Sequence, residues 1–321
     1  MRPSGPVLVA AVVTAFAAHL LTPIGNLVEL RRSDPALAGM LLEQLRLPRA
    51  LLAAGYGAVL GIAGAALQAT FANPLASPDI TGSSSGAALG AVAGAYWFGI
   101  TDPLVLAAFG AAGAAIALAL LLIVAGSRTD AATLLLAGLA IALAAGAGTS
   151  LLLALAPSPF AFYDSFEWLM GSFVDRSLPQ AAAALVPASL ACALLIRRSR
   201  ALDLMALGEE VVASVGYRPR RLAAEVVALS AIAVGACVSV CGAIGFVGLI
   251  APFLARALTR GHPGQALIPA SAIGALLLLL ADLLVRASPA GRSIPVGVVT
   301  TALGTPLFIW IVVRMRRGVA S

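Results

Sequence analysis

Long apolar stretches separated by shorter polar ones run through almost the whole chain. We count ten stretches with the character of membrane-spanning helices. They cover residues 7–25, 50–71, 80–98, 103–126, 131–156, 179–196, 223–241, 245–258, 267–285 and 295–313. Because backbone polar groups must be satisfied inside the bilayer, the pattern predicts an all-α integral membrane protein with about ten transmembrane helices. For the first stretch a cleaved signal peptide is the alternative, but a retained span fits a chain that stays apolar throughout.

The polar segment 197–222 divides this single transmembrane domain (1–321) into a first half, 1–196, and a second half, 223–321. Its apolar residues recur at the spacing of one helical face, while two glycines interrupt the pattern and predict two short helices. The apolar residues are Leu204, Leu207, Val211, Val212 and Val215, the glycines are Gly208 and Gly216, and Glu209 and Glu210 open the second helix. A solvated loop is one interpretation. A docking surface for a cytoplasmic partner is the other, and the apolar face favours it.

The distribution of positive charge predicts the orientation. With ten spans both termini lie on one side, and thirteen of the 20 basic residues then share that side with segment 197–222. The positive-inside rule therefore places both termini and the central segment in the cytoplasm. We attribute the net charge of +6 to topology and lipid contact, not to nucleic-acid binding.

Composition excludes several classes of protein. The chain is 61% hydrophobic and only 11% charged, which excludes a soluble globular domain. All of its basic residues are arginines, so it lacks the lysine that a phosphate-binding P-loop requires. His19 and His262 lie far apart and provide no histidine metal site. Cys237 and Cys241 are one helical turn apart, but buried apolar cysteines explain them better than a metal pair.

Small residues predict close helix packing and a weak internal repeat. Gly57, Gly61 and Gly64 recur near helical spacing, which lets helix backbones approach closely in lipid. Gly64-Ala-Ala precedes Pro74 by the same interval as Gly242-Ala-Ile precedes Pro252. Inverted repeats of this kind are common in transporters.

Several motifs, in order along nearly the whole chain, resemble the FecCD family of ABC importer permeases. They are Arg46-Leu-Pro-Arg49, Gly64-Ala-Ala-Leu-Gln68, Asn73-Pro-Leu-Ala76, Ser84-Ser-Gly-Ala-Ala-Leu-Gly90, Trp168-Leu-Met-Gly-Ser172, Gly242 to Pro252, Ala281-Asp282, Ile294 to Thr300 and Gly304-Thr-Pro306. One position departs from the pattern: Phe253 stands where the family commonly has histidine.

The resemblance implies a type II importer with an inverted repeat of helices 2–5 and 7–10. Two permease copies, expected to be identical, would join two ATP-binding subunits and an extracytoplasmic binding protein in the cell (inner) membrane. This chain would bind no cofactor, since ATP and Mg²⁺ belong to the ATPase subunits.

The resemblance also assigns roles to residues. Leu204 to Gly216 is similar to the coupling helices that contact the ATPase. Arg46, Arg49 and Arg286 match arginines that the family presents to acidic residues of the binding protein, with helix anchoring at the lipid interface as the alternative. Asp130, Ala131, Ala132 and Thr133 match a cytoplasmic gate.

Two other classes of function are weaker. An ion-coupled secondary transporter needs ionisable residues within its spans, and only Asp282 and Glu225 are candidates. An intramembrane enzyme needs paired catalytic groups at membrane depth, which the spans lack. We therefore expect a transport subunit without catalytic residues. A ferric siderophore is the first candidate for its substrate, haem the second and cobalamin the third.

Overall fold

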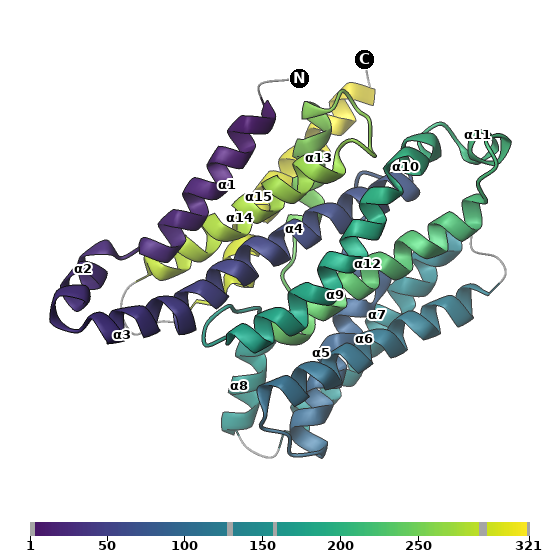
Figure 1. Ribbon diagram of the computed structural model, residues 1–321. Coiled ribbons are helices and arrows are strands. Elements are labelled where there is room, and N and C mark those ends of the chain that lie inside the picture. Colours follow the sequence, from purple (N-terminus) through teal and green to yellow (C-terminus); the bar gives the residue numbers. More distant parts are fainter. Residues whose placement is uncertain (1–3, 127–130, 157–158, 289–293, 320–321) are drawn as a thin grey trace.

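The computed structural model describes residues 4–126, 131–156, 159–288 and 294–319, and the regular structure in these ranges is helical. Ten helices coincide with the ten predicted spans (Figure 1). They are α1 (Ser4–Leu21), α4 (Leu47–Thr70), α5 (Ser83–Trp97), α6 (Pro103–Ala125), α7 (Ala131–Ala154), α9 (Leu178–Arg197), α12 (Pro219–Cys241), α13 (Val247–Leu258), α14 (Leu267–Arg286) and α15 (Val296–Val319). Among the described helices, six are long and apolar enough to cross a membrane, whereas α1, α13 and the apolar part of α15 are shorter.

The polar stretch 26–49 contains more helical structure than the sequence pattern predicted. It forms α2 (Ile24–Ser33), α3 (Pro35–Met40) and a π-helical turn, Leu41–Arg46, that leads into α4. The Asp34 carboxylate accepts hydrogen bonds from the backbone N–H groups of Ala36 and Leu37, both at 3.0 Å. This cap, with Pro35 at the first helical position, starts α3 where hydropathy alone gives no signal.

The expected loop between the fifth and sixth spans contains a further helix, α8 (Pro159–Leu169). Phe162 and Phe166 follow helical spacing, and their rings stack with centroids 5.9 Å apart. The ring of Tyr163, the next residue along, meets Phe162 edge-on at 5.8 Å. The prediction of a loop over residues 157–178 was therefore wrong here, because an aromatic pair four residues apart stabilises a helix that is too short to read as a span.

Helix α4 lies in the centre of the bundle. It packs against α9, α12, α13 and α14, and most of its side chains are buried. Figure 1 shows α4 crossing the middle of the molecule, with α1 and α14 on one side of it and α9 and α12 on the other. Both halves of the chain thus share one core, and α4 carries its N-terminal arginines into contact with α1 and α14.

The glycines of α4 confirm the predicted close packing. A Cβ atom at Gly57 would overlap the carbonyl oxygen of Gly274, and one at Gly61 would overlap that of Ala270. A Cβ atom at Gly64 would overlap the carbonyl oxygen of Gly248 on α13. Such small-residue contacts let helices gain van der Waals packing where lipid removes the hydrophobic driving force.

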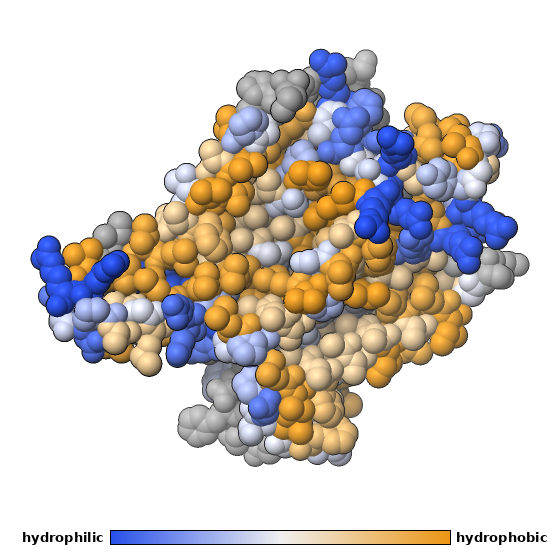
Figure 2. All heavy atoms as spheres, viewed as in Figure 1, coloured by the Kyte–Doolittle hydropathy of each residue, from blue (hydrophilic) through white to orange (hydrophobic). Residues whose placement is uncertain are grey.

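Polar groups gather at the two ends of the bundle, and an apolar surface lies between them (Figure 2). Large side chains exposed on this surface include Ile116, Ile123, Leu136, Leu143, Leu190 and Leu303. Figure 1 shows the start of α1 and the end of α15 at the same end of the bundle as the central segment. This arrangement agrees with an even number of spans.

The two segments of the weak internal repeat, 64–74 and 242–252, occupy different positions in their helices. Gly64 lies inside α4, whereas Gly242, with φ of 74°, ends α12. Pro74 follows α4, whereas Pro252 lies inside α13. The inverted repeat therefore stays a prediction.

Candidate functional site: an arginine cluster and a coupling segment

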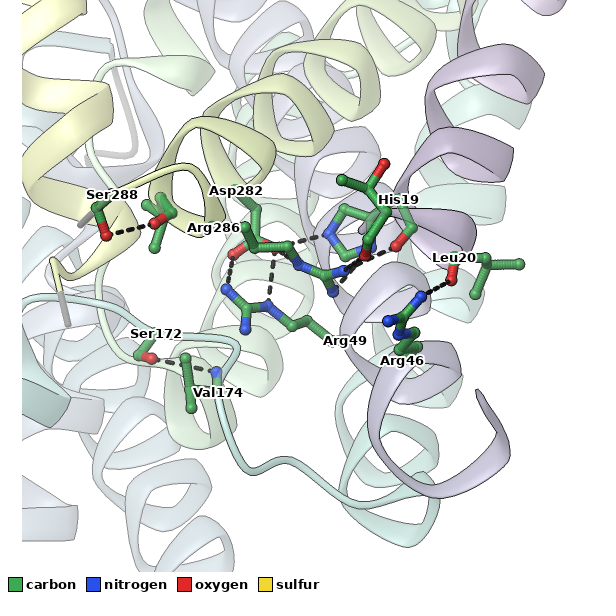
Figure 3. Close-up of polar contacts among 11 residues, drawn as sticks. His19, Leu20, Arg46, Arg49, Ser172, Val174, Asp282, Arg286 and Ser288 are labelled. Carbon is green, nitrogen blue, oxygen red and sulfur yellow. Dashed lines mark hydrogen bonds and ion pairs between the residues drawn. The ribbon is translucent and has the colours of Figure 1, made fainter. Parts of the chain in front are cut away.

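The three arginines predicted to dock a binding protein lie in one cluster with Asp282 (Figure 3). The Asp282 carboxylate, on α14, is only 1% exposed. Arg49, in the first turn of α4, donates two hydrogen bonds to it, from Nε to Oδ2 at 2.8 Å and from Nη2 to Oδ1 at 2.9 Å. His19 Nε2 lies 2.6 Å from Oδ2. Paired geometry of this kind is the strongest that a guanidinium makes with a carboxylate.

Arg286 and Arg46 hold the end of α1 in this cluster. Arg286 Nη1 donates to the carbonyl oxygen of His19 at 2.8 Å, and its Nε lies 3.5 Å from Asp282 Oδ2. Arg46 Nη1 donates to the carbonyl oxygen of Leu20 at 2.8 Å. The last carbonyls of a helix lack partners within that helix and carry partial negative charge. The two arginines therefore satisfy the end of α1, and Arg286 also lies against Asp282.

The cluster is more buried than a simple docking surface. Arg46 is 8% exposed, and the side chains of Arg49 and Arg286 are 17% and 13% exposed. Sequence analysis found the three arginines but did not predict that Asp282 pairs with Arg49 and Arg286, or that His19 contacts the same carboxylate. An ionisable residue in an apolar span was the available signal, because such residues are costly unless they are paired.

A cavity of about 690 Å³ opens beside the cluster. Its walls come from the start of α4, the end of α14, the segment before α15 and the loop between α8 and α9. Its lining residues include Arg49, Arg286, Trp168, Asp175 and Arg176. Figure 3 shows this loop, with Ser172 and Val174, lying next to Arg49.

The central segment folds as two short helices, α10 (Ser199–Met205) and α11 (Glu209–Ser214), as predicted. Gly208 separates them with φ of 104°, and Gly216, with φ of 93°, follows the second. Both conformations suit glycine, because a side chain would be strained there. Glu209 and Glu210 occupy the first turn of α11 and are exposed.

The apolar residues of this segment divide into anchors and exposed contacts. Val212 is fully buried, and Leu204 and Val211 are partly buried. Leu207 and Val215 are 67% and 58% exposed. Asp203 also fixes α10, because its carboxylate accepts a hydrogen bond from the backbone N–H of Gly264 at 2.8 Å. The segment is thus tied to the bundle while two apolar side chains face outward.

Only part of the predicted gate, residues 130–133, lies within the described residues. Asp130 lies outside the described residues, as does the side chain of Ala131. Ala132 is exposed and Thr133 is partly buried in the first turn of α7. Phe253, at the position where histidine is common, is partly buried on α13.

Electrostatics at the cavity are dominated by burial and charge pairing. Burial lowers the pKa of the Arg176 guanidinium from its usual value, because desolvation disfavours the cation, and nearby Asp175 acts in the opposite direction. An arginine stays charged after such a shift, since its ordinary pKa lies far above neutral pH. The cavity wall therefore presents positive charge at neutral pH.

The model of the FecCD transport family matches residues 6–314. The chain belongs to the FecCD transport family. This FecCD permease is 36% identical over 277 residues to the Fe(3+)-citrate import system permease protein YfmE of Bacillus subtilis, covering 84% of this chain and 81% of the relative. It is 38% identical over 290 residues to the vitamin B12 import system permease protein BtuC of Vibrio cholerae, covering 87% and 84%.

Two further comparisons agree with this assignment. The hemin transport system permease protein HmuU of Yersinia pestis is 37% identical over 282 residues, covering 85% of this chain and 83% of the relative. A solved inward-facing metal-chelate type ABC transporter superposes with a TM-score of 0.85 at 30% identity, covering 96% of this chain and 97% of that one. The FecCD permease is thus a multi-pass membrane subunit of an ABC importer, is not itself the ATPase, and is expected to hold no cofactor.

Proposed function

We propose that this FecCD permease imports a ferric chelate, with a ferric siderophore as the first candidate. The observation that carries the proposal is the family match over residues 6–314 together with the similarity to a ferric citrate permease. Haem and cobalamin are the alternatives, supported by the hemin and vitamin B12 relatives. In each case the chelate would move from outside the membrane to the cytoplasm.

The proposed complex has two copies of this chain, two ATP-binding subunits and one extracytoplasmic binding protein. Segment 197–222 and both termini would face the cytoplasm. Leu204 to Gly216 would contact the ATPase, where Leu207 and Val215 offer apolar contacts and Glu209 and Glu210 offer charge. ATP-driven closure of the ATPase dimer would move this segment and change access to the pathway. Residues 130–133 would form its cytoplasmic gate.

At the opposite end, Arg46, Arg49 and Arg286 would meet acidic residues of the binding protein. Asp282 supports this role indirectly, because it holds the Arg49 fork in one geometry before any partner arrives. A preorganised guanidinium loses less side-chain entropy on docking, and its charge raises the rate of encounter.

Reconstitution tests the proposed function. The FecCD permease with its ATPase and binding protein should take up one of three ligands, ferric siderophore, haem or cobalamin, only when ATP and the binding protein are both present. Uptake by this chain alone under an ion gradient would overturn the proposal and favour a secondary transporter that uses Asp282.

We expect the variant with Glu209→Ala and Glu210→Ala to lose most ligand uptake and most binding-protein-stimulated ATP hydrolysis. Both side chains are exposed, so the fold should survive. The contact with the ATPase should weaken by about 2–5 kcal/mol, the usual cost of truncating one partner of a charge pair that becomes buried at an interface. Uptake in proteoliposomes and ATPase co-purification measure the effect.

The matched control for this variant is Glu29→Ala, an exposed acidic residue on α2 at the opposite end of the bundle. It should leave ATPase association unchanged. Equal loss of association in the two variants would show that Glu209 and Glu210 have no specific coupling role.

A further inference from the structure

Hydrophilic side chains gather where α9 ends and α12 begins (Figure 2). A pocket of about 260 Å³ lies there, and its charged lining residues are Arg198, Arg218, Arg221 and Glu225. Arg198 Nε donates a hydrogen bond to Glu225 Oε1 at 2.9 Å, so these two charges offset each other. Arg218 and Arg221 are exposed, and among the described residues neither forms an ion pair. This arginine pocket therefore carries a surplus of positive charge.

An apolar groove of about 560 Å³ lies between α6, α9 and α12. It opens onto the apolar surface of the bundle, because Ala111, Ala115 and Ile232 are exposed in its walls. Ser239 is its one polar lining residue in the described part of the chain. The Ser239 hydroxyl donates to the carbonyl oxygen of Ala236 in the same helix at 2.9 Å. The groove therefore suits an apolar occupant, which its walls hold by dispersion contacts.

The arginine pocket and the apolar groove lie along one face of α12. Their residues on this helix follow at intervals of four, seven and four, the spacing of one helical face, and are Arg221, Glu225, Ile232 and Ala236. On the neighbouring α9, Pro187 lines the groove, and Arg198, just after the helix, lines the pocket. The helix between Glu225 and Ile232 is about 10 Å long, which is within the hydrocarbon depth of one leaflet, about 15 Å. One lipid molecule can therefore reach both.

We propose that this face binds one anionic phospholipid of the cytoplasmic leaflet, with its phosphate in the arginine pocket and an acyl chain in the groove. Guanidinium forks match phosphate oxygens, and basic pockets between membrane helices on the cytoplasmic side bind anionic headgroups. The inference rests on the proposed orientation, in which segment 197–222 faces the cytoplasm. An acidic surface of the ATPase would match the arginines but not the groove beside them, so the combination favours a lipid.

Lipid binding to the purified full chain in detergent tests the proposal. The probes are dioleoyl phosphatidylglycerol, which is anionic, and dioleoyl phosphatidylcholine, which is zwitterionic and has the same chains. Native mass spectrometry counts the bound molecules, and we expect phosphatidylglycerol to bind more tightly. Arg218→Gln combined with Arg221→Gln should weaken its binding about 30-fold, because two arginines no longer attract the anionic headgroup. The binding of phosphatidylcholine should change little.

Arg31→Gln combined with Arg32→Gln is the matched control. It removes the same charge from two exposed positions on α2, at the opposite end of the bundle, and should leave phosphatidylglycerol binding unchanged. Glu225→Gln has the opposite expected sign, because it frees Arg198 and adds to the positive charge of the pocket. Equal weakening by the two double variants would show attraction to overall charge and would overturn the site.

Ala115→Phe tests the groove separately. Ala115 is exposed in the wall of the groove, so the larger ring should fill the groove without disturbing the core. It should weaken the binding of phosphatidylglycerol severalfold, because the acyl chain loses its contacts. Ala112→Phe, at an exposed position of α6 that does not line the groove, is the control and should have no effect. Equal effects of the two variants would remove the groove from the site.

Three further results would overturn the inference and leave the importer assignment intact. Equal affinity for the two lipids would remove the headgroup as its basis. Displacement of phosphatidylglycerol by an equal concentration of inorganic phosphate would make the pocket a site for free anions. Weaker association of the ATPase with the variant at Arg218 and Arg221, with unchanged lipid binding, would make the pocket part of the ATPase contact.

Ser214→Cys separates this inference from the proposed orientation. Ser214 is exposed at the end of α11, whereas the three native cysteines are buried. A membrane-impermeant maleimide should therefore label the variant in inside-out vesicles and not in right-side-out vesicles. Labelling from the outside would overturn both the cytoplasmic leaflet and the proposed orientation. Failure of lipid binding in detergent would overturn the inference alone.

Discussion

Asp282→Asn should destabilise the FecCD permease by about 3–5 kcal/mol, the usual cost of removing one partner from a buried ion pair. The carboxylate is 1% exposed and receives both hydrogen bonds of Arg49, and Arg286 Nε lies 3.5 Å from it. Without its charge, two largely buried guanidinium groups would face each other unpaired. Thermal unfolding of the purified chain in detergent, followed by size-exclusion chromatography, measures the loss.

Glu225→Gln is the matched control, because it removes the other carboxylate that forms an ion pair with an arginine in the described part of the chain. Arg198 Nη2 lies 2.8 Å from Glu225 Oε1, but the two side chains are 44% and 35% exposed. Exposed pairs contribute about 0–1 kcal/mol. Equal losses of stability in the two variants would contradict the view that burial gives the Asp282 cluster its importance.

A double variant separates structure from docking. Combining Asp282→Asn with Arg49→Met removes both partners, so it should lose less stability than the two single losses added together. If Arg49 serves only the fold, this double variant should regain binding-protein affinity along with stability. We expect stability to return in part and docking to remain weak, because the Arg49 guanidinium is absent.

Much of the fold could be predicted from hydropathy, because lipid imposes one requirement on every span. Each of the ten predicted stretches coincides with a helix in the structure. Gly57, Gly61 and Gly64, which predicted close helix packing, lie against the backbone of neighbouring helices. The two short helices of the central segment followed from the glycines that interrupt its pattern. What hydropathy could not reveal was α8 and the helices within 26–49, since their signals are caps and aromatic pairs of only a few residues.

The arginine cluster could not be predicted because its contacts join residues that are far apart in the sequence. Asp282 pairs with Arg49 across 233 residues and with His19 across 263 residues. Periodicity describes one helix at a time and carries no information about which helix lies beside it. The family resemblance supplied roles for the arginines, whereas Asp282, although part of one of its motifs, received no role. Arg176, in a loop, follows no period and belongs to none of the motifs that carry the resemblance.

Gly64→Ala should destabilise the FecCD permease more than any other single methyl group added to α4. The new Cβ would overlap the carbonyl oxygen and approach the Cα atom of Gly248, and backbone atoms cannot rotate away as a side chain can. Overpacking costs about 1–3 kcal/mol and occasionally more, and a clash with backbone belongs at the upper end of that range. Thermal unfolding in detergent and the folded yield after purification measure it.

The comparison that decides the cause is Gly146→Ala on α7, where a Cβ would meet nothing within 4 Å. Alanine is the better helix former by about 1 kcal/mol, so this variant should be neutral or slightly more stable. The same chemical change thus has opposite expected signs at two helical glycines. Equal effects at both positions would mean that helix propensity, not backbone contact, sets the stability. A loss confined to Gly64 would show that the close contact of α4 with α13 contributes to the stability of the permease.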